Sequence, residues 1–131
     1  MYRSKTISVV LPCYNEQEGI GKAIEEFCAT GWVDEIIVVD NNSSDCSAAI
    51  VKGTKARLVT EQRQGYGYAL RKGMESATGE IIILAEPDGT FVARDILKLL
   101  AYSDDFDVVL GTRTTRELIW SGANMGMFLQ G

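Results

Sequence analysis

The sequence predicts an α/β protein of three layers, with a mainly parallel sheet between two layers of helices. Short, almost wholly apolar runs alternate with segments of helical periodicity along its 131 residues. Strands that are apolar on both faces are typical of parallel sheets, because helices cover both sides of such a sheet. The length and the apolar fraction of 46% together fit one compact domain with a sizeable core.

The first strand is predicted at residues 7–11, and the helix that follows it at residues 15–30. The apolar residues of this helix recur three and four positions apart and form one buried face: Ile20, Ala23, Ile24, Phe27 and Cys28. Asn15 and Glu18 have the spacing of a capping box, which predicts the start of the helix. Gly31 is the type of residue that ends one.

The rest of the chain continues the same alternation. Further strands are predicted at residues 35–40, 56–60, 80–85 and 106–110, and further helices at 45–52, 67–78 and 94–102. The helix at 67–78 has one apolar face, made of Leu70, Gly73, Met74 and Ala77, and ends at Gly79. The α/β domain is therefore expected to span residues 1–111, and residues 112–131 have only weak helical character.

Composition restricts the possible functions. The net charge of −5 argues against nucleic-acid binding, because the chain offers no basic stripe for phosphates. It has no histidine, so any metal must be held by oxygen, which favours Mg²⁺, Mn²⁺ or Ca²⁺. Three scattered cysteines, Cys13, Cys28 and Cys46, indicate reduced thiols in a cytoplasmic protein. No apolar run reaches the ~18 residues that a membrane span needs.

The residues just after the strands are the expected site, because ligands of open parallel sheets bind beyond the carboxyl ends of the strands. Four polar, turn-forming segments follow strands, at residues 12–16, 40–45, 62–67 and 86–90. In the last of them, Glu86 and Asp88 are two like charges separated by one proline. Such a pair repels unless a cation lies between the carboxylates, so it predicts a divalent-metal site with positions open to substrate phosphates.

Two further signals each allow two interpretations. Asp45 is explained equally well as a cap of the helix that follows it. Gly65 and Gly67 open a helix, where glycines let backbone amides approach an anion, but a tight turn would need them as well. Arg63, Arg71 and Lys72 could add positive charge to such a site, although most residues of this kind are solvated.

With these pieces in place, the chain resembles the family 2 glycosyltransferases, which have the GT-A fold, from about Ser8 to Arg113. The segment "VVLPCYNEQEGI" resembles the V-x-P-x-Y-N-E opening, and "IIVVDNNSSDCS" resembles V-D-D-G-S-x-D-x-T. The segment "RQGYGYALRKGMESATGEIIILAEPDGT" resembles N-x-G-x-G-x-A followed by the D-x-D metal motif, and "VVLGTR" resembles V-x-G-S-R. Through "PDGTF" and "GTR" the chain is most similar to dolichyl- or polyprenyl-phosphate sugar synthases.

The resemblance implies a role for each matching residue. Those that would bind the nucleotide of a UDP- or GDP-sugar are Pro12, Tyr14, Glu16, Asp40, Asp45, Gly65, Gly67, Arg71 and Glu86. Among them, Pro12, Tyr14 and Glu16 would line the pocket for the base and ribose. The implied catalytic residues are Asp88 and Arg113. Asp88 would join Glu86 at the Mg²⁺ or Mn²⁺ ion and the diphosphate, and Arg113 would approach the acceptor phosphate.

The implied reaction transfers a sugar to an acceptor with inversion at the anomeric carbon. The similarity to polyprenyl-phosphate sugar synthases implies a polyprenyl phosphate as one acceptor. A lipid phosphate is already anionic at pH 7, so it needs no general base, which fits the lack of histidine. The chain departs from the family at Glu86, where an aspartate is usual, and at Asn41 and Asn42, which replace Asp-Gly. The family's catalytic domain also continues beyond Gly131. We therefore expect 1–111 to be the donor-binding domain and 112–131 the start of a truncated acceptor-side segment.

Other functions fit less well or remain open. A dinucleotide-dependent oxidoreductase would need a third glycine where this chain has Leu70, and its motif would follow the first strand. A phosphoacceptor receiver domain would need an acidic pair where only Glu16 stands. A non-catalytic nucleotide-sugar-binding or oligomerisation fragment remains open, and a turnover measurement would distinguish it from an enzyme.

The last twenty or so residues predict self-association. They carry a heavy apolar load with no following element to bury it: Leu118, Ile119, Trp120, Met125, Met127, Phe128 and Leu129. We therefore expect a homo-oligomer. In a longer protein these residues would pack against an acceptor-side half or lead to the cytoplasmic face of a membrane.

Overall fold

The computed structural model describes residue 1, residues 4–87 and the backbone of residues 108–110. Its elements in chain order are β1 (Ile7–Cys13), α1 (Ile20–Ala29), β2 (Glu35–Asp40), α2 (Ser47–Lys52), β3 (Arg57–Thr60), α3 (Tyr66–Ser76), β4 (Ile81–Leu84) and β5 (Val108–Leu110). The predicted alternation of strands and helices is confirmed over this part of the chain. The helix expected at 94–102 and the segment 112–131 lie outside the described residues.

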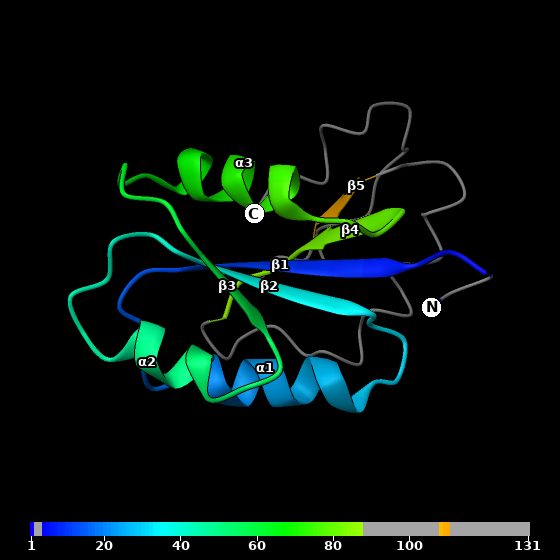
Figure 1. The fold of residues 1–131 in the computed structure, drawn as a ribbon, viewed down its shortest axis with the longest axis horizontal. Coiled ribbons are helices and arrows are strands. Elements are labelled where there is room, and N and C mark those ends of the chain that lie inside the picture. Colours follow the sequence, from blue (N-terminus) through cyan, green and yellow to red (C-terminus); the bar gives the residue numbers. More distant parts are fainter. Residues whose placement is uncertain (2–3, 88–107, 111–131) are drawn as a thin grey trace.

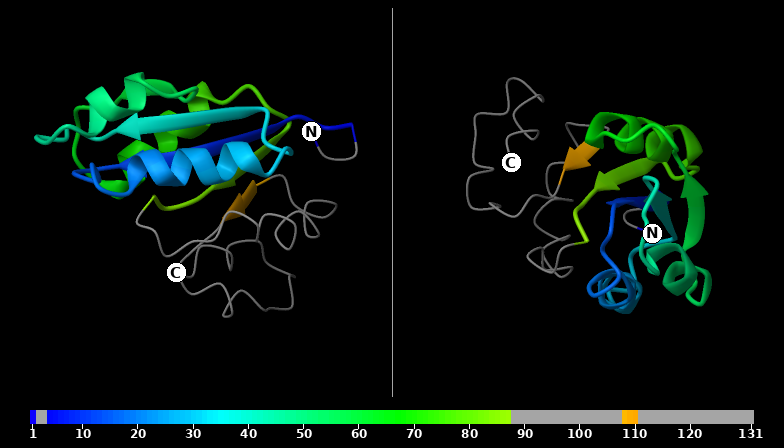
Figure 2. Two further views of the ribbon diagram at one scale, coloured as in Figure 1. Left: turned by 90° about the horizontal axis from the view of Figure 1, so that it is seen from below. Right: turned by 90° about the vertical axis from the view of Figure 1, so that its left-hand side faces the viewer.

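The five strands form one sheet in the order β3-β2-β1-β4-β5, and every neighbouring pair is parallel. Figures 1 and 2 show α1 and α2 on one face of this sheet and α3 on the other. The chain runs outward from β1 to β2 and β3, and then returns through α3 to form β4 on the opposite side of β1. The predicted three-layer α/β architecture is confirmed, and the strand order reverses between β1 and β4.

The core is centred on β1 and β2, because these strands have neighbours on both edges and helices on both faces. All seven residues of β1 are buried, including the polar Ser8, and so are the last five residues of β2. Helix α1 contributes Ile20, Ile24 and Phe27, which belong to the face that the periodicity predicts, whereas Cys28, predicted on the same face, is exposed. Strand β3 lies at the edge of the sheet, so its four residues remain partly or fully exposed.

The predicted capping box at the start of α1 is wrong. The helix begins at Ile20, and Asn15 has a backbone φ of +52°, which a right-handed helix excludes. The Asn15 side chain instead accepts a hydrogen bond from the backbone N–H of Ser44, 2.9 Å away. The end of the helix is as predicted, because Gly31 follows Thr30 with a φ of +80°.

Helix α3 lies close to the sheet at a glycine. A Cβ on Gly73 would collide with the Val10 side chain and would come within 3.1 Å of Val39 Cγ2. Ala69 and Gly73 are its buried residues, whereas Met74, which the periodicity placed on the same face, is exposed. Within the described residues, no helix is both long enough and apolar enough to span a bilayer.

Candidate functional site

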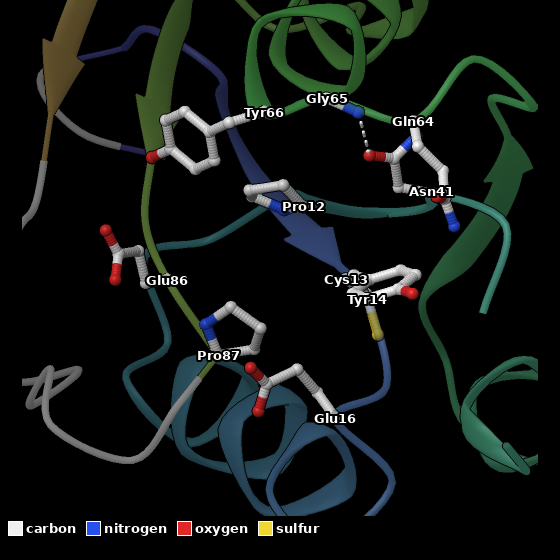
Figure 3. Close-up of a pocket in the computed structure, with 10 residues that line it drawn as sticks. All are labelled: Pro12, Cys13, Tyr14, Glu16, Asn41, Gln64, Gly65, Tyr66, Glu86 and Pro87. Atoms are coloured by element: carbon white, nitrogen blue, oxygen red, sulfur yellow. Dashed lines mark hydrogen bonds between the residues drawn. The ribbon is translucent and has the colours of Figure 1, made fainter. Parts of the chain in front are cut away.

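A cavity of about 510 Å³ opens at the carboxyl edge of the sheet. Figure 3 shows the ten residues that line it: Pro12, Cys13, Tyr14, Glu16, Asn41, Gln64, Gly65, Tyr66, Glu86 and Pro87. They come from the segments that follow β1, β2, β3 and β4. The register brings these segments together, because Cys13 pairs with Asp40 and Asp40 with Thr60. The cavity therefore lies where a parallel sheet that reverses its strand order binds ligands.

Successive residues of the loop after β1 contact two different places: some line the cavity, and others bind the loop after β2. Tyr14 and Glu16 line the cavity, whereas the backbone N–H of Asn15 donates to the hydroxyl of Ser43 at 3.0 Å. The Asn15 carboxamide in turn accepts from Ser44, as described above. Sequence reasoning treated Asn15 as a helix cap and missed this reciprocal bond, because its partners are 28 and 29 residues away.

Asp45 continues the same connection between the two loops. Its carboxylate accepts the backbone N–H of Gln17 at 3.2 Å, and the Gln17 side chain accepts the N–H of Cys46 at 3.0 Å. The other carboxylate oxygen accepts the hydroxyl and the N–H of Ser47, at 2.5 and 2.9 Å. The Ser47 hydroxyl is the foremost cause that lowers the pKa of Asp45. The N-cap of α2 is Cys46, so Asp45 precedes the cap, although its carboxylate reaches the N–H of the first helical residue, Ser47. Asp45 does not line the cavity.

The end of β2 contributes Asn41 to the cavity rather than Asp40. Asp40 is buried, accepts the backbone N–H of Ser43 at 3.3 Å and is absent from the cavity lining. Asn42 has a φ of +64°, a left-handed conformation that asparagine adopts more easily than most residues. The asparagine that replaces the glycine of the family motif is thus compatible with the turn.

The loop between β3 and α3 holds its own charges. Arg63 donates to both oxygens of Glu61, at 3.0 and 3.2 Å, and its guanidinium lies 4.6 Å from the centre of the Tyr68 ring. These bonds, foremost the one from the Arg63 side chain, lower the pKa of Glu61 to about 2. The positive charge that Arg63 could have offered to an anion is therefore already paired.

Helix α3 points its N-terminus at the cavity. Its N-cap is Gly65, whose φ of +150° lies in a region that favours glycine, and Gly65 itself lines the cavity. Of the other residues predicted here, Gly67 and Arg71 do not line it. Arg71 is exposed and pairs with Glu75 at 3.5 Å on the same helix.

Cys13 is a buried thiol in the cavity wall. Burial is the main cause that raises the pKa of this thiol to about 11. Burial thus favours the protonated thiol at pH 7 over the thiolate, which is the reactive form.

Glu86 lies on the β4 side of the cavity, across from Tyr14 and Asn41 in Figure 3. Glu16 and Glu86 are the carboxylates of the lining, and oxygen donors of this kind suit Mg²⁺ and Mn²⁺. Over residues 4–87, no group of three or more ligating side chains surrounds a common point. An ion at Glu86 would thus need further ligands. The predicted catalytic residues Asp88 and Arg113 lie outside the described residues.

The approach of this segment to α1 depends on Gly19. A Cβ at Gly19 would come within 2.8 Å of the backbone carbonyl oxygen of Pro87. Sequence reasoning did not single out Gly19. It also missed five lining residues, namely Cys13, Asn41, Gln64, Tyr66 and Pro87, although all of them lie within the four turn segments that it proposed.

Comparison with protein families and curated proteins gives concordant matches. A family described as Glycosyl transferase family 2 matches residues 8–125. An uncharacterized glycosyltransferase of Mycobacterium tuberculosis is 39% identical over 108 residues, which cover 82% of this chain and 48% of that protein. Protein RfbJ of Shigella flexneri is 30% identical over 115 residues, which cover 86% of this chain and 89% of that protein. The chain thus spans about half the length of the mycobacterial relative.

Solved structures share the fold. Glucosyl-3-phosphoglycerate synthase of M. tuberculosis, in complex with Mn²⁺, uridine diphosphate and glucosyl-3-phosphoglycerate, is 27% identical with a TM-score of 0.67. The similarity covers 76% of this chain and 40% of that one. Mannosyl-3-phosphoglycerate synthase from Rubrobacter xylanophilus is 24% identical with a TM-score of 0.70, covering 77% and 37%. The second likeness concerns the fold alone.

Proposed function

The chain belongs to glycosyl transferase family 2, and from this membership we propose that its cavity binds the nucleotide of a nucleotide-diphospho-sugar. The observation that carries the proposal is the position of the cavity. It lies at the reversal of strand order, beside the N-terminus of α3, and is lined by four turn segments. The uridine diphosphate and Mn²⁺ in the complex of the mycobacterial synthase support the same class of donor.

The lining suggests how the donor would be held. Tyr14 has 51% of its surface exposed beside the buried Pro12, so its ring offers an aromatic face to a base. The backbone amides that begin α3 attract negative charge, which suits a diphosphate. Glu86, together with Asp88, would hold Mg²⁺ or Mn²⁺. When bound, such an ion offsets the charge that develops on the leaving diphosphate.

The proposed reaction is an inverting transfer. An acceptor oxygen forms a bond to the anomeric carbon while the bond from that carbon to the diphosphate breaks, and the nucleoside diphosphate leaves with the electron pair. We propose a polyprenyl phosphate as the acceptor, used at the cytoplasmic face of a membrane. The phosphoglyceric acid in complexes of the mycobacterial synthase supports a phosphorylated acceptor in general, so both acceptors belong in the test.

Titration calorimetry of the 131-residue chain tests donor binding. We expect UDP or GDP to bind in Mn²⁺ and to bind at least about tenfold more weakly in EDTA, because the ion neutralises the diphosphate beside Glu86. The proposal is wrong if neither nucleotide binds, or if affinity in EDTA equals that in Mn²⁺.

A variant locates the metal-dependent part of the binding. Glu86→Gln keeps the size of the side chain and removes its charge, so it should weaken binding in Mn²⁺ and leave binding in EDTA no weaker than in the wild type, because it also removes the repulsion of the diphosphate. Glu18→Gln removes a charge from an exposed residue of the loop after β1 and is the matched control. Equal behaviour of the two variants would remove Glu86 from the metal site.

A binding module without turnover is the second candidate, because the chain spans only 48% of its mycobacterial relative. Release of nucleoside diphosphate from a donor sugar, measured with a polyprenyl phosphate and with phosphoglyceric acid, distinguishes the two. Multiple turnovers by the 131-residue chain would support the enzyme, and binding without transfer would support the module.

A further inference from the structure

We propose that Asn41 is a positioning residue, whose carboxamide fixes residues 61–65 against the end of β2 and thereby sets how tightly the cavity holds a nucleotide. The ligand part of this inference rests on the proposed function. The part that concerns the loop does not, because it follows from the contacts of the unliganded chain.

The Asn41 side chain uses both of its polar ends on this loop. Its amide nitrogen donates to the backbone carbonyls of Glu61 and Arg63, at 2.9 and 2.8 Å. Its oxygen accepts the backbone N–H of Gly65 at 2.9 Å, the bond drawn in Figure 3. Its own backbone N–H donates to the carbonyl of Cys13 at 2.8 Å, which anchors it to β1. Asn41 is 6% exposed, its bond to Glu61 is buried, and its bonds to Arg63 and Gly65 are partly buried.

The loop that Asn41 holds forms one wall of the cavity. Gln64, Gly65 and Tyr66 all line it, and Gly65 begins α3. Two other bonds join the loop to this end of β2: Glu61 N–H donates to the Asp40 carbonyl at 3.0 Å, and the Gln64 side chain donates to the Asn42 carbonyl at 3.3 Å. Among the described residues, only the Asn41 side chain is hydrogen-bonded to three alternate residues of the loop, at positions 61, 63 and 65.

The carboxamide is the only common side chain of this size that satisfies all three bonds. An ionised carboxylate can accept from Gly65, but it has no hydrogen to donate to the two carbonyls. The carbonyl oxygens of Glu61 and Arg63 would then face a negative charge, the first in a buried and the second in a partly buried place, which is unfavourable. An aspartate, which the family motif has at this position, would therefore not hold this loop in the same way.

Asn41→Asp is the informative variant, because protonation restores part of what it removes. A neutral carboxylic acid donates one hydrogen bond, so lowering the pH should recover some of the lost function. The charged and titratable groups next to Asn41 or in contact with it are Asp40 on β2, Cys13 on β1, and Glu61 and Arg63 in the loop. Lys72 on α3 interacts with Glu61. Since the terminal phosphate of the nucleotide itself titrates at about pH 6, the measured quantity is the ratio of variant to wild-type affinity at each pH.

Two further variants complete the experiment. Asn42→Asp makes the same charge change one residue along, at an exposed side chain, and should bind nucleotide as the wild type does. Asn41→Ala removes the tether without adding a charge, so its deficit should not change with pH. Asn41→Ala also keeps the proposal testable if Asn41→Asp does not fold.

We measure UDP and GDP affinity in Mn²⁺ at about pH 8 and about pH 5.5, spanning the range in which a buried carboxyl is expected to titrate. For Asn41→Asp we expect a loss of about tenfold or more at the higher pH and a smaller loss at the lower pH. A loss of the same size at both pH values, or no loss, would overturn the proposal.

Hydrogen exchange of the ligand-free chain supplies the independent measurement. The peptide that contains residues 61–65 should exchange faster in Asn41→Asp and Asn41→Ala than in Asn42→Asp, while peptides of β1 stay protected. Unchanged exchange would refute the role in the loop. A wild-type chain that binds neither nucleotide would refute the proposed function and the ligand part of this inference, and exchange would still decide the rest.

Discussion

Gly73 is the point at which α3 comes closest to the sheet, and its lack of a side chain permits that approach. Gly73→Ala should lower the free energy of unfolding by about 1–3 kcal/mol, the usual cost of overpacking, since its Cβ meets Val10 and Val39. Urea denaturation measures the change. Gly67→Ala in the same helix is the control, because nothing lies within 4 Å of its Cβ. It should be neutral or stabilising by up to about 1 kcal/mol, and equal effects of the two would contradict this account.

A second prediction at this scale concerns pH. The folded chain holds the pKa of Glu61 at about 2, below its ordinary value of 4.5. A depressed pKa in the folded state means that the carboxylate contributes stability above about pH 4.5 and loses it as the pH falls toward 2. As the pH falls from about 4.5 toward 2, the urea denaturation midpoint should thus decrease less steeply in Glu61→Gln than in the wild type. Parallel pH profiles would show that the pair with Arg63 contributes nothing to stability.

At the scale of elements, Glu35 joins strands and connections at the amino end of the sheet. Its carboxylate accepts the hydroxyl of Ser8 in β1 at 2.7 Å, a guanidinium N–H of Arg57 in β3 at 3.1 Å, and the N–H and hydroxyl of Thr78 at 3.0 and 3.1 Å. Burial opposes ionisation of Glu35, but these hydrogen bonds outweigh it and lower the pKa. One side chain thus ties together β1, β2, β3 and the segment before β4.

Glu35→Ala should therefore lower the free energy of unfolding by about 1.5–3 kcal/mol, the range for hydrogen bonds to a charged group. Nucleotide affinity of the folded variant should stay unchanged, because Glu35 lies at the amino end of β2 whereas the cavity lies at the carboxyl ends of the strands. Thermal unfolding and calorimetry measure the two quantities. Glu25→Ala, at an exposed position of α1, controls for the loss of an acid. A weaker affinity in Glu35→Ala would contradict the separation between the two edges of the sheet.

The elements also mark how far sequence reasoning reaches. Apolar runs located the strands of the described part because a strand buried on both faces needs an unbroken apolar run, as in β2. The predicted start of α1 was wrong because the Asn15 side chain binds the distant Ser44 and does not cap the helix. The turn segments of the cavity were predictable because strand ends converge. The role of Asn41 was not, because its partners lie 20 to 24 residues along the chain.

At the scale of the whole molecule, the family match covers residues 8–125, whereas the mycobacterial relative is about twice as long as the matched region. The division into a donor-binding domain at 1–111 and an acceptor-side segment at 112–131 stays a prediction, as does self-association through the apolar residues of that segment. Light scattering should give more than one copy per particle, and a variant with Leu118, Trp120 and Phe128 changed to serine should shift toward a single copy. A monomeric wild-type chain would contradict the prediction.

The protonated thiol of Cys13 has a practical consequence for following the motions of this protein. Cys28 and Cys46 are exposed, so a small alkylating reagent should modify both of them rapidly, before it modifies Cys13. Cys13 should react only in molecules in which the end of β1 has opened to solvent, because exposure lets the Cys13 thiol lose its proton more readily. Mass spectrometry after a timed pulse of reagent would thus count open molecules directly. A bound nucleotide that closes the cavity should lengthen the time before the third cysteine is labelled.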